Sequence, residues 1–217
     1  MISNMKPLIA AKIAPLLILL ALLAPPAGAV EYSAVQTEKS SLGFVFKQMG
    51  VAVNGRFPKF SAQLAFDPAR PEAGQVSISI DLAGVDAGSS DANDEIVGKD
   101  WFNVRKFPVA TFTSSGMKSL GGGKYEAAGS LTIKGKSQPV IAPFTFKSDG
   151  NSGIFEGSFT VKRIDFAVGE GAWTDVSMVA NDVQVNFRVQ AAASAAAVSP
   201  PARPAAPAKA AAPIKSK

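Results

Sequence analysis

The stretch that most constrains the fold is residues 41–67, where apolar and polar side chains alternate. The apolar side chains on every second position are Leu42, Phe44, Phe46, Phe60, Leu64 and Phe66. Because successive side chains of a strand point to opposite faces of a sheet, this period predicts strands with one apolar face. The aromatic bulk exceeds what a short hairpin can bury by itself. A closed barrel or a sandwich of antiparallel strands is therefore expected.

The same alternation continues along the chain. It is cleanest in residues 75–82, QVSISIDL, and returns in residues 110–115, 125–133, 140–147, 154–161 and 182–190. Residues 31–35 are a further short strand, expected at a sheet edge, where it could pair with a second copy of the chain. Glycine-rich loops such as residues 121–123 separate the strands. Eight to ten short strands with short loops are typical of an antiparallel barrel or sandwich.

One segment breaks the strand pattern. In residues 89–107, Ser90 or Asp91 is a suitable helix N-cap, and Asp94 and Glu95 follow in the first turn. We predict one or two helical turns near residues 91–104, lying across a barrel mouth. A cation site built from the acidic residues is the weaker interpretation, because the ligand spacing of a calcium loop is absent.

The two ends of the chain differ from its middle. Residues 1–29 combine Lys6 and Lys12, an apolar run over residues 13–23 and the small residues Ala27-Gly28-Ala29, which predicts a cleavable signal peptide and export. Residues 191–217 are rich in Ala, Pro and Lys, which predicts a disordered cationic tail. This tail could act as a spacer or contact an anionic membrane or envelope polymer. The folded domain is expected to span residues 30–190.

Composition excludes several functions. Of the 22 basic residues, six lie in the two end segments, which leaves 16 in residues 30–190 against 17 acidic residues. The folded part is therefore not basic, and no nucleic-acid partner is expected. The chain contains no Cys and no His. It lacks the residues most used for covalent haem, zinc and general-base chemistry, so neither a metal nor a cofactor is expected.

A polar group near the C-terminal end of the domain allows three interpretations. Arg163, Asp165, Glu170 and Asp175 surround Trp173 in the sequence. They could form an arginine with carboxylate partners that closes the barrel, a polar site for a ligand head, or a carboxylate pair for acid–base catalysis. The first interpretation is favoured over the second, and catalysis is the least favoured.

The aromatic residues are similarly ambiguous. Fourteen Phe and two Trp could fill a barrel core or line a channel. An eight-stranded barrel is just wide enough to be filled by side chains or to hold one slender ligand. Small residues at inward positions, such as Ala62, Ala127, Gly129 and Gly157, favour a channel.

Several motifs together resemble the YceI family of periplasmic polyisoprenoid-binding proteins. They are S-x-x-F-x-F-K at residues 41–47, G-V-x-V-x-G-R-F-x-x-F at 50–60, F-D-P-A-x-P at 66–71, K-F-P-x-A-x-F at 106–112, G-x-L-T-I-K-G at 129–135 and G-E-G-x-W-x-D at 169–175. The resemblance covers about residues 31–190. It implies an extended antiparallel β-barrel, lipocalin-like in shape, whose apolar tunnel holds a long-chain isoprenoid or fatty lipid without a covalent bond.

On this resemblance we expect a lipid carrier rather than an enzyme. The residues expected to line its tunnel are Phe44, Phe46, Met49, Phe60, Phe112, Phe159, Phe166 and Trp173. Gln48 and Arg163 are expected at the polar end of the ligand. Many family members have His where this chain has Gln48, which can form hydrogen bonds but cannot titrate. Two alternatives remain: an envelope structural or stress-response protein with a filled barrel, and an enzyme that acts on a bound lipid through Asp165, Glu170 and Asp175.

Overall fold

The computed structural model describes residues 30–195. They form ten strands and one α-helix, connected by short loops and four single turns of 3-10 helix. The strands are β1 (Val30–Val35), β2 (Ser41–Gln48), β3 (Val51–Arg56), β4 (Phe60–Ala65), β5 (Gln75–Asp81), β6 (Val109–Gly121), β7 (Lys124–Ile133), β8 (Lys136–Asp149), β9 (Ser152–Lys162) and β10 (Asp182–Ala195). The helix is α1 (Ser90–Ile96), and the 3-10 turns are η1 (Thr37–Lys39), η2 (Pro71–Ala73), η3 (Arg163–Phe166) and η4 (Gly171–Thr174).

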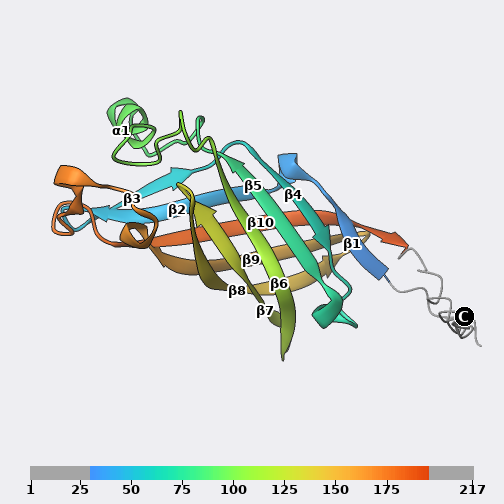
Figure 1. Cartoon of the computed structure of the whole chain (residues 1–217). Helices are drawn as coiled ribbons and strands as arrows, with labels where there is room; N and C mark the ends of the chain where they lie inside the picture. Colours follow the sequence, from blue (N-terminus) through green and yellow to red (C-terminus); the bar gives the residue numbers. More distant parts are fainter. Residues whose placement is uncertain (1–29, 196–217) are drawn as a thin grey trace, which may run out of the picture.

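All strand pairs are antiparallel, in the order β3-β2-β10-β9-β8-β7-β6-β5-β4. The sheet curls around a long axis (Figure 1), and β1 joins its two sides at one end. There β1 pairs with the last part of β10 and forms a bridge between Tyr32 and Phe66, just after β4. The Tyr32 N–H donates to the Phe66 carbonyl at 2.8 Å, and the Phe66 N–H donates to the Tyr32 carbonyl at 3.2 Å. The predicted all-β, antiparallel, lipocalin-like fold is confirmed, and its ten strands are at the upper end of the predicted eight to ten.

The end closed by β1 is filled with aromatic rings. Phe66 is fully buried, and its ring centroid lies 5.1 Å from that of Phe146 and 5.2 Å from those of Tyr125 and Phe155. Tyr32 of β1 packs edge-on against Phe146 at 4.9 Å. Because these rings occupy the space between the strands, this end of the barrel is a solid core.

The opposite end carries the irregular segments. Figure 1 shows α1, the β2–β3 hairpin and the connection from β9 to β10 gathered there, away from β1 and the end of β10. The helix begins at Ser90, and the Ser89 side chain accepts a hydrogen bond from the Ala92 N–H at 3.3 Å. The predicted helical segment is present but ends at Ile96, and its N-cap Ser89 lies one residue before the nearer of the two predicted candidates, Ser90.

One predicted boundary is wrong. β10 continues to Ala195, and residues 191–195 pair with β1, so the domain does not end at Gln190. The other predictions for the chain ends, a signal peptide in residues 1–29 and a tail beyond Ala195, lie outside the described residues. Within residues 30–195, no helix has both the length and the apolar character that crossing a membrane requires.

Candidate functional site

A large apolar cavity occupies the barrel between the aromatic core and the irregular end. Its volume is about 510 Å³, and its lining is apolar except for Gln48, Ser89, Asp91, Glu95 and Arg163. The first four are exposed, and they come from the end of β2 and from α1. The cavity therefore has a polar mouth at the irregular end and an apolar floor that includes Phe144 and Phe155. Volumes of this size are typical of sites for small molecules.

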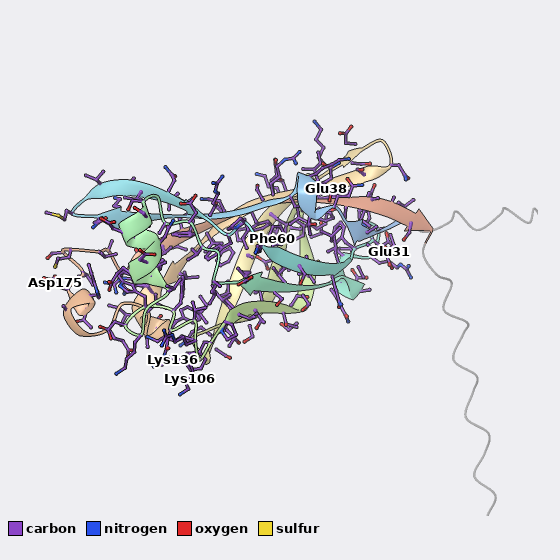
Figure 2. All side chains as sticks on the ribbon, turned by 90° about the horizontal axis from the view of Figure 1, so that it is seen from above. Glu31, Glu38, Phe60, Lys106, Lys136 and Asp175 are labelled. Atoms are coloured by element: carbon purple, nitrogen blue, oxygen red, sulfur yellow. The ribbon has the colours of Figure 1, made fainter. Side chains whose placement is uncertain are left out.

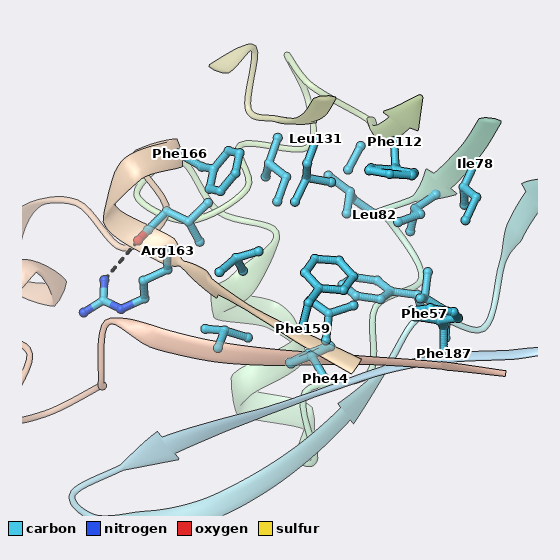
Figure 3. A pocket seen from close by; sticks show the side chains of 18 of the residues that line it. Phe44, Phe57, Ile78, Leu82, Phe112, Leu131, Phe159, Arg163, Phe166 and Phe187 are labelled. Atoms are coloured by element: carbon cyan, nitrogen blue, oxygen red, sulfur yellow. Dashed lines mark hydrogen bonds between the residues drawn. The ribbon is translucent and has the colours of Figure 1, made fainter. Parts of the chain in front are cut away.

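Side chains from opposite walls of the sheet face one another across the cavity. Figure 3 shows Phe44, Phe159 and Phe187 on one side, and Phe112 and Leu131 on the other. The predicted tunnel residues that lie in the lining are Phe44, Phe46, Phe112, Phe159, Phe166 and Trp173. Each of the first four occupies an inward position of its strand, as the alternation predicts.

Two of the predicted tunnel residues are outside the lining. Met49 is 77% exposed, because it occupies the two-residue turn between β2 and β3 and points away from the barrel. Phe60 has the same parity as Ala62 and Leu64, which do line the cavity, but it is only partly buried against the core and is not part of the lining. These two residues are corrections to the predicted site.

The sequence prediction also missed several lining residues. Phe57, Phe187, Trp101 and Leu131 contribute large side chains to the wall. Phe187 and Leu131 could have been found, because each lies at an inward position of an alternating strand. Trp101 follows α1 in an irregular segment, where no period indicates the direction of a side chain.

The small inward residues behave in two ways. Ala62 and Ala127 line the cavity, and their small side chains leave space in it. In contrast, Gly129 and Gly157 are covered by neighbouring rings: a Cβ at Gly129 would lie 2.7 Å from the Phe112 ring, and one at Gly157 would overlap Phe187. These glycines therefore seat aromatic rings against the sheet, which corrects the prediction that they leave open channel.

Arg163 lies at the start of η3, and its side chain is enclosed by backbone carbonyls. Its Nε donates to the carbonyl of Ala180 at 3.1 Å. The remaining acceptors are the carbonyls of Val168 and Gly169 for Nη1, at 3.0 and 3.1 Å, and those of Trp173 and Val179 for Nη2, at 2.6 and 2.7 Å. All five N–H groups of the guanidinium are therefore used. One of these bonds is drawn in Figure 3.

This arrangement corrects two expectations for Arg163. Its partners are carbonyls rather than carboxylates, and it retains no N–H group for the polar head of a ligand. Burial lowers the pKa of the guanidinium from its ordinary value, but arginine remains charged in proteins. The charge is further balanced by the Trp101 ring, whose centroid lies 5.6 Å from the guanidinium carbon. Arg163 holds the connection between β9 and β10 in place.

The three carboxylates considered for catalysis do not form a pair. Asp165, Glu170 and Asp175 are exposed. Hydrogen bonding to Lys134 lowers the pKa of Glu170, and hydrogen bonding to Ser177 lowers that of Asp175. Neither is held in the protonated form that a general acid needs. Within residues 30–195, no three His, Cys, Asp or Glu side chains are grouped so that they could hold a metal ion.

A buried lysine also holds the connection between β9 and β10 in place. Lys134 follows β7, and its Nζ donates to Glu170 Oε2 at 2.7 Å and to the carbonyl of Ala167 at 2.8 Å. The Lys134 side chain is only 6% exposed. Together with Arg163 it orients the segment that carries Trp173 to the cavity mouth.

Replacing Glu170 by glutamine is expected to lower the melting temperature at neutral pH, because buried Lys134 loses a charged partner. Lys134 holds the pKa of Glu170 below its ordinary value of 4.5. The ion pair is therefore at full strength above that pH and weakens as the pH falls through the lowered pKa. Melting curves of both proteins from neutral to acidic pH should converge at the acidic end. A difference independent of pH would contradict the ion-pair explanation.

Two tryptophans line the mouth of the cavity. The Trp173 Nε1 donates to Glu95 Oε1 of α1 at 2.9 Å, and the rings of Trp101 and Trp173 lie 5.4 Å apart. Gln48 also lies at the mouth and is bridged to Val179 in an antiparallel pair. The mouth therefore combines aromatic faces with a few hydrogen-bonding groups.

A curled antiparallel β-sheet that encloses an apolar cavity is the architecture of a protein that binds an apolar ligand. The family model for the YceI-like domain matches residues 34–191, so the chain belongs to this family. Among curated relatives, a UPF0312 protein of Ectopseudomonas mendocina is 32% identical over 140 residues, which cover 61% of this chain and 73% of the relative.

Solved structures show the same fold. BcnA of Burkholderia cenocepacia is 44% identical, with a TM-score of 0.70 over 72% of this chain and 98% of BcnA. The YceI protein of Campylobacter jejuni is 25% identical, with a TM-score of 0.59 over 64% of this chain and 83% of that protein. A polyisoprenoid-binding domain from Saccharophagus degradans is 16% identical, with a TM-score of 0.58 over 76% and 99% of the two chains.

Proposed function

We propose that the protein binds a long-chain isoprenoid lipid in its cavity, and that it carries or sequesters this lipid in the periplasm after export. The observation that carries the proposal is the cavity of about 510 Å³, apolar along its walls and floor and polar only at its mouth. Burial of each CH2 group contributes about 0.8 kcal/mol, so a long chain can bind tightly with few polar contacts. The relative whose structure is described as a polyisoprenoid-binding domain supports this ligand class.

The cavity also suggests the direction of the ligand. Its floor at the aromatic core is lined by apolar side chains such as Phe144 and Phe155. Gln48 and Glu95 lie at the mouth instead. We therefore place the isoprenoid tail against the floor and the head, such as a quinone ring, at the mouth beside Trp101 and Trp173.

The cavity does not support the two alternative functions, a structural barrel and an enzyme that acts on a bound lipid. A structural barrel with a filled core would have no large cavity, and here only the end closed by β1 is filled. An enzyme acting on the lipid through Asp165, Glu170 and Asp175 would need one of them in the cavity, and none of the three lies in its lining.

Intrinsic fluorescence tests this function directly, because the chain has only two tryptophans and both line the cavity. Titration with an isoprenoid quinone is expected to quench the fluorescence saturably at one quinone per chain, since a quinone ring is a good electron acceptor. A polyprenyl alcohol of equal length is the control: it should compete for the cavity but quench less. Quenching that never saturates, and that the alcohol does not relieve, would contradict binding in the cavity.

A further inference from the structure

The mouth end of the barrel carries an unusual apolar tip. Among the described residues, nine large apolar side chains are exposed, and four of them, Met49, Val51, Val176 and Met178, come from two adjoining segments at this end. They come from the β2–β3 turn and from the segment before β10, which are joined by a 2.8 Å hydrogen bond from the Met49 N–H to the Met178 carbonyl. Figure 2 shows Asp175, the neighbour of Val176, at the extreme of the mouth end and Glu31 at the opposite end.

Met49 is not a residue type that suits the backbone conformation of its turn. Met49 and Gly50 form the two-residue loop of the hairpin, with φ angles of 50° and 81°. In such loops Asn or Gly is strongly preferred at the first position, because both residues there must adopt positive φ. Met49 is nevertheless 77% exposed, so it gains no packing within the barrel in return. A residue that breaks a local rule without structural compensation points to a function outside the fold.

The tip is continuous with the cavity. Gln48 and Val179 are paired in an antiparallel bridge, and both line the cavity mouth. Their chain neighbours Met49 and Met178 are exposed at the tip. A surface that contacts the tip therefore lies next to the route by which an apolar ligand enters the cavity.

We propose that this tip docks onto the surface of a phospholipid bilayer, so that lipid passes between the bilayer and the cavity mouth. A few apolar side chains are enough to enter the interfacial region of a bilayer. They are too few for a stable contact with a second copy of the chain, which needs about 800 Å² from each partner.

The charges around the tip fit the level of the phospholipid head groups. An outer groove next to Val176 is lined by Lys47, Lys162 and Asp182. Lys162 pairs with Asp182 at 2.9 Å, and Lys47 adds a second positive charge that suits a lipid phosphate. On the other side of the mouth, α1 carries Asp91, Asp94 and Glu95. These acids disfavour a strongly anionic surface, so apolar contact rather than net charge drives the docking.

Vesicle flotation of the full chain tests the proposal. The protein is expected to float with phosphatidylcholine vesicles, and added phosphatidylglycerol should not be required. The double variant Met49→Asn, Met178→Ser should bind these vesicles at least about tenfold more weakly, because two exposed apolar side chains are lost. Asn suits the turn, so this variant should fold at least as well as the original protein.

Leu120→Ser with Ile141→Ser is the matched control. These residues are 50% and 61% exposed on β6 and β8, and their replacement should leave vesicle binding unchanged. Absence of flotation by the original protein, or an equal loss in the control, would overturn the docking surface. Self-association that the tip variant abolishes would also overturn it, in favour of a contact between two copies.

Docking of the tip onto a bilayer does not depend on the lipid-binding function proposed above. Only the passage of lipid between the bilayer and the cavity rests on that function. Quinone quenching measured in detergent should be unchanged in the tip variant, because Met49 and Met178 do not line the cavity. Loss of vesicle binding with unchanged quenching supports the docking surface. Absence of quenching in the original protein is a failure of the lipid-binding function, and it can be recognised separately from a failure to float.

Discussion

The Arg163→Met variant is expected to lose about 3–5 kcal/mol of unfolding free energy, because a buried acceptor left without its donor costs about 1–3 kcal/mol. Methionine replaces the aliphatic part of the arginine side chain but donates no hydrogen bond. The five carbonyls that enclose Arg163 would then lose this donor, and three of the five hydrogen bonds lie in buried surroundings. Urea denaturation followed by circular dichroism measures the loss, and the melting temperature should fall by about 10 °C.

Arg188→Met is the matched control. Arg188 lies on β10, and its Nε donates to Glu156 Oε1 at 2.9 Å, but both side chains are substantially exposed. Such surface pairs contribute about 1 kcal/mol or less, so the control should be far milder. Equal losses in the two variants would show that the carbonyls around Arg163 contribute no special stability.

The Ala62→Phe variant is expected to bind an isoprenoid lipid at least about tenfold more weakly while remaining folded. Ala62 on β4 lines the cavity, in register with Ile78 of β5 and, across that strand, with Phe112 of β6. A phenyl ring there would occupy space that the lipid needs. Because the ring enters a cavity rather than a packed core, the melting temperature should change little without ligand. Calorimetric titration of the delipidated protein measures the affinity.

Gln63→Phe is its control, one residue along the same strand. Gln63 is exposed on the outer face of β4, so the added ring does not reach the cavity. Affinity should match that of the original protein. Equal weakening by both substitutions would mean that the strand is perturbed and would contradict a role for the free space next to Ala62.

The regular part of the fold could be predicted from the alternation of apolar side chains, because that pattern is local. It identified most strands and placed Phe44, Phe112 and Phe159 on the inner face. It could not locate the two ends of the cavity. The solid end depends on the pairing of Tyr32 with Phe66, which are distant in the sequence.

Other features could not be predicted from the sequence, for different reasons. Residues 191–195 are mostly alanine, which has a low strand preference, and they are ordered by pairing with β1 rather than by their own composition. The partners of Arg163 are backbone carbonyls, which every residue possesses, so no sequence pattern could indicate them. Met49 follows an alternating strand, and the positive φ of its turn directs it away from the barrel.

The central claim is tested most directly by organic extraction and mass spectrometry of the protein purified from its native cells. The account predicts an isoprenoid lipid at about one molecule per chain, retained in Gln63→Phe and strongly reduced in Ala62→Phe. A well-folded protein that yields no lipid, or one whose lipid content is unchanged in Ala62→Phe, would contradict the claim that the cavity is an isoprenoid-binding site.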